Sequence, residues 1–195
     1  MFTKLNLMIA RLREEIEFAY SRLSKSAEIG CDTETSGLSA RRDRLLSVQF
    51  SDGNFSVLVP ISENIPLGKL SDILENPQQM KIFHNAKFDL EFLRENGYVV
   101  ANIFDTMIAE KVLTYGADQS ASLAETLYRY FAINLDKTQR ATFTNRNWNG
   151  LWTPELVEYA LSDVLYLPKL KQEQDAWLER LNLKEKFQIQ MRKIA

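Results

Sequence analysis

The sequence predicts a single α/β domain in which a mixed β-sheet is flanked by α-helices. An alternating apolar pattern over 46–50 leads through an Asp52-Gly53 turn into a second apolar strand over 55–59, which indicates a β-hairpin. Farther along, short apolar strands alternate with amphipathic helices, which is typical of a sheet covered by helices. The 195 residues, 45% of them hydrophobic, suffice for one such core.

The individual elements follow from local patterns. We expect strands over 27–34, 46–50, 55–59, 81–84 and 103–104. We expect helices over 3–23, 69–75, 86–95, 106–115 and 122–131, a polar irregular segment over 136–152, and a last long helix that begins at Thr153-Pro154. The apolar spacing over 3–23 divides the chain into an N-terminal helix, 1–26, and a domain over 27–195.

Capping residues support several of these helices. Ser122 followed by Glu125 is a capping box, and Thr153 before Pro154 combines an N-cap with a proline at the first helical position. Asp105 can cap the helix that follows it, although a metal-ligating role for this residue is also open. Pro168 should kink the last helix, because proline lacks the N–H that the helical hydrogen bond needs.

Composition excludes several classes of protein. A single cysteine, Cys31, excludes an internal disulfide, and no Cys/His cluster offers a structural zinc site, so a reducing, cytoplasmic location is expected. No apolar run reaches the roughly 20 residues of a membrane span, and no signal-peptide core begins the chain, so no membrane partner is expected. The net charge of −2 gives no general attraction to polyanions.

Acidic residues lie where the pattern predicts a packed core. Asp32 and Glu34, two residues apart in the strand, point to one face of the sheet, where two carboxylates repel each other. Asp89 lies beside Phe92 on the apolar side of its helix, and Asp163 shares a face with Tyr159. Each acid alone also fits a capped turn or a satisfied buried aspartate, but four acids together indicate a cation site.

The donor set indicates which cation is expected. Carboxylates without histidine or thiolate favour a hard ion, Mg²⁺ or Mn²⁺. Two such ions about 3.5–4 Å apart form the usual clamp for phosphoryl transfer, in which one ion activates water and the other stabilises the leaving oxygen. A tyrosine one turn before an acid can hold the water by a hydrogen bond. The acids therefore predict phosphodiester hydrolysis.

Three motifs in order resemble the DEDD superfamily of 3′–5′ exonucleases, with its ribonuclease H-like fold. They are Asp32-Thr33-Glu34, Asp89 within HNAKFDLEFL, and Tyr159 four residues before Asp163. Tyrosine in the last motif is similar to the DEDDy branch, which includes ribonuclease D, the Werner-type exonucleases and the proofreading domain of bacterial DNA polymerase I. The resemblance covers about residues 27–171 and makes 27–195 the exonuclease domain.

The resemblance implies a role for each matching residue. It implies that Asp32 bridges two divalent metal ions, that Glu34 and Asp163 complete the first metal site and that Asp89 holds the second. It implies that Tyr159, with Glu34, orients the attacking water. Substrate contacts are implied for Thr33, Thr35, Leu38, Asn85 and Phe88, with Leu38 packing on the terminal base; a plain core position for Leu38 remains an alternative.

The expected partners are 3′ ends of single-stranded or frayed DNA or RNA, with nucleoside 5′-monophosphates as products. Arginines after the first motif and the Trp148 to Trp152 loop, which Lys137, Arg140 and Arg146 flank, can guide the strand; equally, both tryptophans can be core residues. The alternative function is a non-catalytic nucleic-acid-binding or editing module of a larger assembly. The apolar stripe of the N-terminal helix leaves room for a protein partner.

Overall fold

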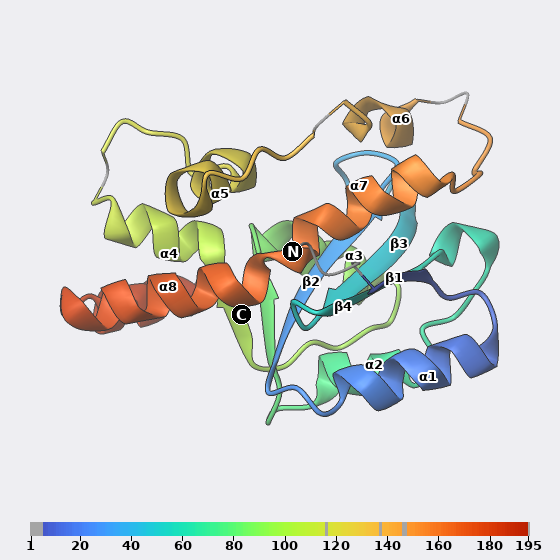
Figure 1. The fold of residues 1–195 in the computed structure, drawn as a ribbon, viewed down its shortest axis with the longest axis horizontal. Coiled ribbons are helices and arrows are strands. Elements are labelled where there is room, and N and C mark those ends of the chain that lie inside the picture. Colours follow the sequence, from blue (N-terminus) through green and yellow to red (C-terminus); the bar gives the residue numbers. More distant parts are fainter. Residues whose placement is uncertain (1–5, 116, 137, 146–147, 195) are drawn as a thin grey trace.

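The computed structural model describes residues 6–115, 117–136, 138–145 and 148–194, and in them a six-stranded mixed sheet forms the centre (Figure 1). The strand order is β1-β4-β3-β2-β5-β6. β1 and β4 are parallel, β4–β3 and β3–β2 are antiparallel, and β2–β5 and β5–β6 are parallel. The strands are β1 Asn6–Ile9, β2 Glu28–Thr35, β3 Leu45–Ser51, β4 Phe55–Val59, β5 Met80–Phe83 and β6 Ile103–Asp105.

Helices cover both faces of this sheet. One face packs on α1 Arg13–Leu23, α2 Leu70–Glu75 and α3 Ala86–Glu95, through a core that includes Ile16, Leu74 and Leu93. The other face packs on α4 Thr106–Leu113, α5 Leu123–Phe131, α7 Pro154–Leu165, α8 Leu167–Arg180 and α9 Lys184–Met191. The short elements are η1 Ile61–Glu63 and α6 Arg140–Thr144. The predicted α/β class, with a mixed sheet flanked by helices in one domain, is confirmed.

The predicted N-terminal helix over 3–23 is wrong in its first half. Residues Asn6–Ile9 form β1, which pairs in parallel with β4 at the edge of the sheet, and the helix begins only at Arg13. The Glu15 side chain accepts hydrogen bonds from the backbone N–H groups of Arg11 and Leu12 and so closes the start of α1. The N-terminal segment thus adds a strand to the common sheet, while the division of the chain at residue 26 stays a prediction.

The predicted kink at Pro168 is a break between two helices. α7 ends at Leu165, and α8 begins at Leu167 with the proline in its first turn, where a missing N–H leaves no hydrogen bond unmade. The 136–152 segment, predicted to be irregular, also contains the five-residue helix α6. Across the part of the chain that the structure describes, we find no helix of the length and apolarity that spanning a membrane requires.

Candidate active site

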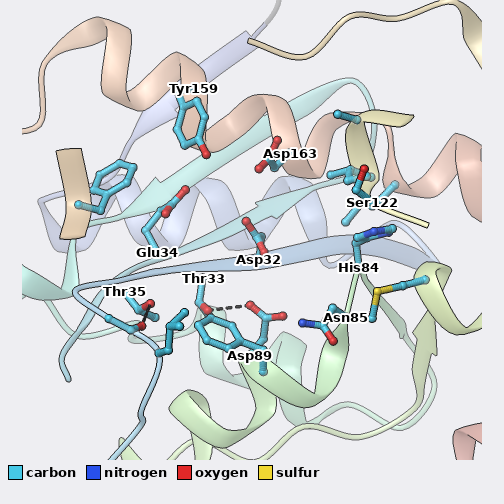
Figure 2. A pocket seen from close by; sticks show the side chains of 18 residues that line it. Asp32, Thr33, Glu34, Thr35, His84, Asn85, Asp89, Ser122, Tyr159 and Asp163 are labelled. Atoms are coloured by element: carbon cyan, nitrogen blue, oxygen red, sulfur yellow. Dashed lines mark hydrogen bonds between the residues drawn. The ribbon is translucent and has the colours of Figure 1, made fainter. Parts of the chain in front are cut away.

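A pocket of about 490 Å³ lies where β2 ends, between α3 on one side of the sheet and α7 on the other (Figure 2). Every residue that the sequence analysis placed in the site lines this pocket: Asp32, Thr33, Glu34, Thr35, Leu38, Asn85, Phe88, Asp89, Tyr159 and Asp163. The structure therefore brings together three motifs, the first and last of which are more than a hundred residues apart in the sequence.

The alternation of β2 distributes its side chains between two sides of the pocket. Asp32 and Glu34 point toward α7, whereas Thr33 and Thr35 point toward the α3 side (Figure 2). The Thr35 hydroxyl donates a hydrogen bond to the Gly37 carbonyl at 2.7 Å. The strand thus continues through both acids to Thr35, so the alternative in which it ends at Cys31 and the acids cap a turn is wrong.

α7 carries Tyr159 and Asp163 over Asp32 and Glu34 (Figure 2). The helix can come this near to the strand because residue 30 is a glycine. A Cβ added at Gly30 would lie 2.6 Å from the carbonyl oxygen of Val164 and 3.1 Å from the Cβ of Leu167. Real Cβ atoms essentially never show a contact of 2.6 Å, so glycine at this position allows the first and third motifs to lie this close together.

α3 supplies Asp89 from the opposite side of the sheet. The Asp89 side chain is 2% exposed, and its Oδ1 accepts a 2.7 Å hydrogen bond from the Thr33 hydroxyl (Figure 2). Burial raises the pKa of Asp89 to about 7, although the Thr33 hydrogen bond counters part of that rise. This acid is thus held by the strand that carries the first motif.

The carboxylates of the site oppose one another's ionisation. Burial, and then the neighbouring charges of Asp89, Asp163 and Glu34, raise the pKa of Asp32 well above its ordinary value. Carboxylate oxygens are the ligands that Mg²⁺ and Mn²⁺ prefer, so the donor set suits such an ion. Among the residues that the structure describes, no three acids stand close enough together to hold an ion as they are.

The rim of the pocket is formed by exposed residues. Leu38 is 81% exposed and lies in the loop between Ser36 and Arg44. The Ser36 N–H donates a hydrogen bond to the Arg44 carbonyl, and the Arg44 N–H donates one to the Ser36 hydroxyl oxygen, which closes this loop. The core alternative for Leu38 is therefore wrong. Asn85 is exposed as well, and Phe88 is half-buried against Phe92, with 5.0 Å between the ring centroids.

Other residues of the pocket were missed by the sequence analysis. Ser122, Leu123 and Ala124 at the start of α5, Met107 of α4 and Phe143 of α6 also line it. The capping box at Ser122 predicted a helix start, but no local signal connects that start with a pocket. Asp105, for which a metal-ligating role was open, is a helix cap whose side chain accepts hydrogen bonds from Met107 and Ile108.

The tryptophans of the 148–152 loop are packed against other rings. Trp152 is 5% exposed and lies 5.3 Å from Phe143 between centroids, and Trp148 makes an edge contact with both rings. The core alternative is therefore correct for Trp152, and Trp148 is half-buried. Lys137 and Arg146, which the sequence suggested as guides for a nucleic-acid strand, lie outside the described residues.

The fold and the arrangement of the motifs agree with one protein family. The sequence model described as 3′–5′ exonuclease matches residues 8–175 of the chain. The chain belongs to the 3′–5′ exonuclease family. Among its relatives, ribonuclease D of Bartonella henselae is 32% identical over 155 residues, and ribonuclease D of Jannaschia sp. is 38% identical over 133 residues.

This exonuclease-family chain is short beside those two relatives. The match covers 78% and 67% of the chain but only 37% and 33% of the two ribonuclease D proteins. A solved structure of Brucella melitensis NrnC is closer in size: it is 27% identical with a TM-score of 0.82, and the match covers 98% of this chain and 90% of NrnC. Escherichia coli ribonuclease D, 22% identical with a TM-score of 0.83, shares the fold over 97% of this chain and 50% of its own.

Proposed function

We propose that the chain is a metal-dependent 3′–5′ exonuclease that releases nucleoside 5′-monophosphates from the 3′ end of single-stranded DNA or RNA. One observation carries the proposal: carboxylates from β2, α3 and α7 line one pocket, where burial and then the neighbouring acids raise the pKa of Asp32. Buried acids that repel each other destabilise a fold unless a cation neutralises them. Membership of the exonuclease family supports the same reaction.

The donors of the pocket fit divalent ions. Asp32, Glu34 and Asp163 would hold one ion, and Asp32 with Asp89 would hold a second, after side-chain rotations that draw the oxygens together. Brucella melitensis NrnC, 25% identical to this chain, has been solved with bound Mg²⁺. Such ions neutralise the phosphodiester and lower the pKa of water.

The chain's own residues position the reactants. Tyr159 points its hydroxyl toward Glu34 and Asp163 (Figure 2), where it can donate a hydrogen bond to the attacking water while Glu34 accepts one. Leu38, exposed at the rim, can pack on the terminal base, and the Asn85 amide can bind the sugar–phosphate backbone. The Thr33 hydroxyl holds Asp89, so its contribution to substrate binding goes through that acid.

The substrate that we propose is the terminal part of a strand. The pocket of about 490 Å³ is lined by Leu38 of the loop after β2 and by the start of α5. NrnC, similar in size to this chain, has been solved with bound pGG, a ligand of two nucleotides. This likeness supports a short stretch of nucleic acid as the ligand of the pocket.

A digestion of labelled strands tests the proposed function. The same single strand, as DNA and as RNA, is labelled at its 3′ or its 5′ end and incubated with the full chain and Mg²⁺ or Mn²⁺. The 3′ label should leave first, as a mononucleotide, while the 5′ label stays on a shortening ladder. EDTA, or Asp163→Asn, should stop the reaction, whereas Asp52→Asn at the distant β3–β4 hairpin should leave it unchanged. Cleavage of a closed circular strand, or activity in EDTA, would contradict the proposal.

A further inference from the structure

Asp105 is a buried acid that lies behind the candidate site without lining its pocket. It ends β6, opposite Phe83 of β5, and is 1% exposed. Its Oδ1 accepts hydrogen bonds from the N–H groups of Met107 at 2.8 Å and Ile108 at 3.1 Å, which caps α4. This role in its own helix is the ordinary one for an aspartate N-cap.

The same carboxylate also closes a second helix. Its Oδ2 accepts a 2.8 Å hydrogen bond from the N–H of Ala86, the first residue of α3, and its Oδ1 accepts a 3.2 Å bond from Asn85. One side chain therefore satisfies backbone donors at the starts of both α3 and α4. The first N–H groups of a helix have no partner within it, so each of these contacts replaces one that the helix cannot make itself.

α3 depends on this external cap because the side chain of its own N-cap residue does not cap the helix. Asn85 occupies the N-cap position with φ 73°, in the left-handed region, and its side chain makes no capping hydrogen bond. The Asn85 side chain is instead exposed and lines the pocket (Figure 2). Asp105 thus takes over the capping of α3 and leaves the Asn85 amide available on the pocket side.

The helix that Asp105 closes carries Asp89 three residues after Ala86. Any shift of the first turn of α3 would therefore move the Asp89 carboxylate relative to Thr33 and β2. The next residue strengthens the same junction: the Thr106 hydroxyl donates to the Phe83 carbonyl at 3.0 Å and lies 2.9 Å from Nδ1 of His84. Residues 105 and 106 together hold the chain from 83 to 86, directly before the helix with Asp89.

We infer that Asp105 is a positioning residue of this site: by closing the N-terminus of α3 as well as that of α4, it sets the place of Asp89 and Asn85 at the pocket. The inference rests on the proposed exonuclease function for its catalytic meaning. The structural claim, that one carboxylate caps two helices, depends only on the four hydrogen bonds that Asp105 accepts. Groups that hold a ligating side chain in place typically change metal affinity or activity by about 10- to 100-fold.

Substitutions can separate the position of the carboxylate from its charge. Asp105→Asn keeps the size and one acceptor oxygen for α4, but its amide NH₂ cannot accept from Ala86. Asp105→Glu keeps the charge and displaces the carboxylate by a methylene. Asp52→Asn is the matched control, because Asp52 also accepts backbone hydrogen bonds, from Asn54 and Phe55, at a hairpin outside the pocket.

The experiment begins with NMR on the unsubstituted, metal-free chain. A scalar coupling across hydrogen bonds should connect the Asp105 carboxyl carbon with the amide nitrogens of both Ala86 and Met107. This readout needs neither a variant nor activity. Absence of the coupling to Ala86 would overturn the inference, even if the chain proves to be an exonuclease.

The variants are then compared for Mn²⁺ affinity by calorimetry and for kcat and KM on a short single strand, per folded molecule at pH 8. Asp105→Asn and Asp105→Glu should each lose about 10- to 100-fold in Mn²⁺ affinity and in kcat, while Asp52→Asn should stay within about twofold. Unchanged values for Asp105→Asn, or full affinity in Asp105→Glu, would overturn the positioning role. An inactive parent with intact couplings would instead contradict only the exonuclease function.

Discussion

The hydroxyl of Thr33 donates a 2.7 Å hydrogen bond to the carboxylate of Asp89, which joins β2 to α3 across 56 residues of sequence. The two residues belong to different motifs of the candidate site. Because Thr33 alternates with Asp32 and Glu34, the strand that presents two acids toward α7 also anchors a third acid on its other side. The contact also favours the ionised form of Asp89.

Thr33→Val should raise the pKa of Asp89 above its value of about 7. Valine has nearly the same shape but cannot donate, and the lost bond stabilised the charged carboxylate. A hydrogen bond to a charged group contributes about 1.5–3 kcal/mol, which corresponds to a shift of about one to two pKa units. An NMR titration that follows the Asp89 carboxyl carbon in the metal-free protein measures this pKa. The control is Thr35→Val, whose hydroxyl donates to Gly37 instead; equal titration of Asp89 in all three proteins would refute the role of Thr33.

The metal-free protein should become less stable as the pH rises from about 5 to 7.5. The pKa values of Asp32 and Asp89 are raised in the folded state, that of Asp89 to about 7, whereas an unfolded aspartate titrates near 3.9. Between these values the folded state binds more protons than the unfolded chain, so unfolding becomes easier with increasing pH. Each pKa unit corresponds to about 1.4 kcal/mol.

Urea unfolding in EDTA across that pH range measures the effect. The window ends below pH 8, where Lys81, whose pKa burial lowers to about 8, begins to contribute with the opposite sign. Asp89→Asn should weaken the dependence, since its amide does not titrate whereas Asp32 still does. A free energy of unfolding that is constant or increases over the window in the parent would contradict the assignment.

Gly30→Ala should reduce both stability and activity. The new Cβ would meet the Val164 carbonyl at 2.6 Å, so α7 must move away from β2 and take Asp163 with it. Overpacking of this kind typically destabilises by about 1–3 kcal/mol, and a displacement of about 1 Å in a catalytic group can lower the rate about 100-fold. The measurement is kcat per folded molecule. As a control, Gly97→Ala strains a residue with φ 82° that has open space around it, and it should lose stability alone. Full activity in folded Gly30→Ala would show that the spacing is not critical.

Leu38→Ala should lower activity on paired 3′ ends more than on single strands, without loss of stability. The side chain is 81% exposed, so its removal leaves no cavity in the core. Burying a leucine against a base is worth about 1.5–3 kcal/mol, or roughly tenfold or more in rate if the contact separates the strands. The effect is measured as the rates of the parent and of Leu38→Ala on matched blunt-ended and single-stranded substrates. Leu12→Ala, which replaces an exposed leucine outside the pocket, is the control. Equal losses of rate on both substrates would show that Leu38 does not help to separate paired strands.

Local patterns predicted most of the sheet and its helices. They failed where contacts between residues distant in sequence determine the secondary structure. The spacing of Met8, Ile9, Leu12 and Ile16 fits a helix, yet 6–9 pairs with β4 at the sheet edge, a contact nearly fifty residues away in sequence. The cap at Asp105 was predicted for its own helix, because that signal is local. Its second bond, to Ala86, depends on how β5 and β6 pair and has no signature in the sequence.

The candidate site shows the same division. The acids were recognisable because charge at core positions is unusual, and Tyr159 because it precedes Asp163 by one helical turn. The lining by Phe143 and by the start of α5 was not recognisable from the sequence. Phe143 reaches the pocket through ring packing with Trp152 and Tyr159, which exists only in the folded chain, and the start of α5 also lines the pocket without any local sequence signal. The exposure of Leu38 likewise depends on the loop that Ser36 and Arg44 close.

The most direct test of the account is the unfolding free energy of the parent and of Asp32→Asn at pH 8, each in EDTA and in excess Mg²⁺. We expect Asp32 to destabilise the metal-free fold through burial and through repulsion by Asp89, Asp163 and Glu34. Without metal, Asp32→Asn should therefore be at least as stable as the parent. Mg²⁺ should stabilise the parent, and it should stabilise the variant much less. A clear loss of stability in metal-free Asp32→Asn, or equal stabilisation of both proteins by Mg²⁺, would contradict the claim that these acids form a cation site.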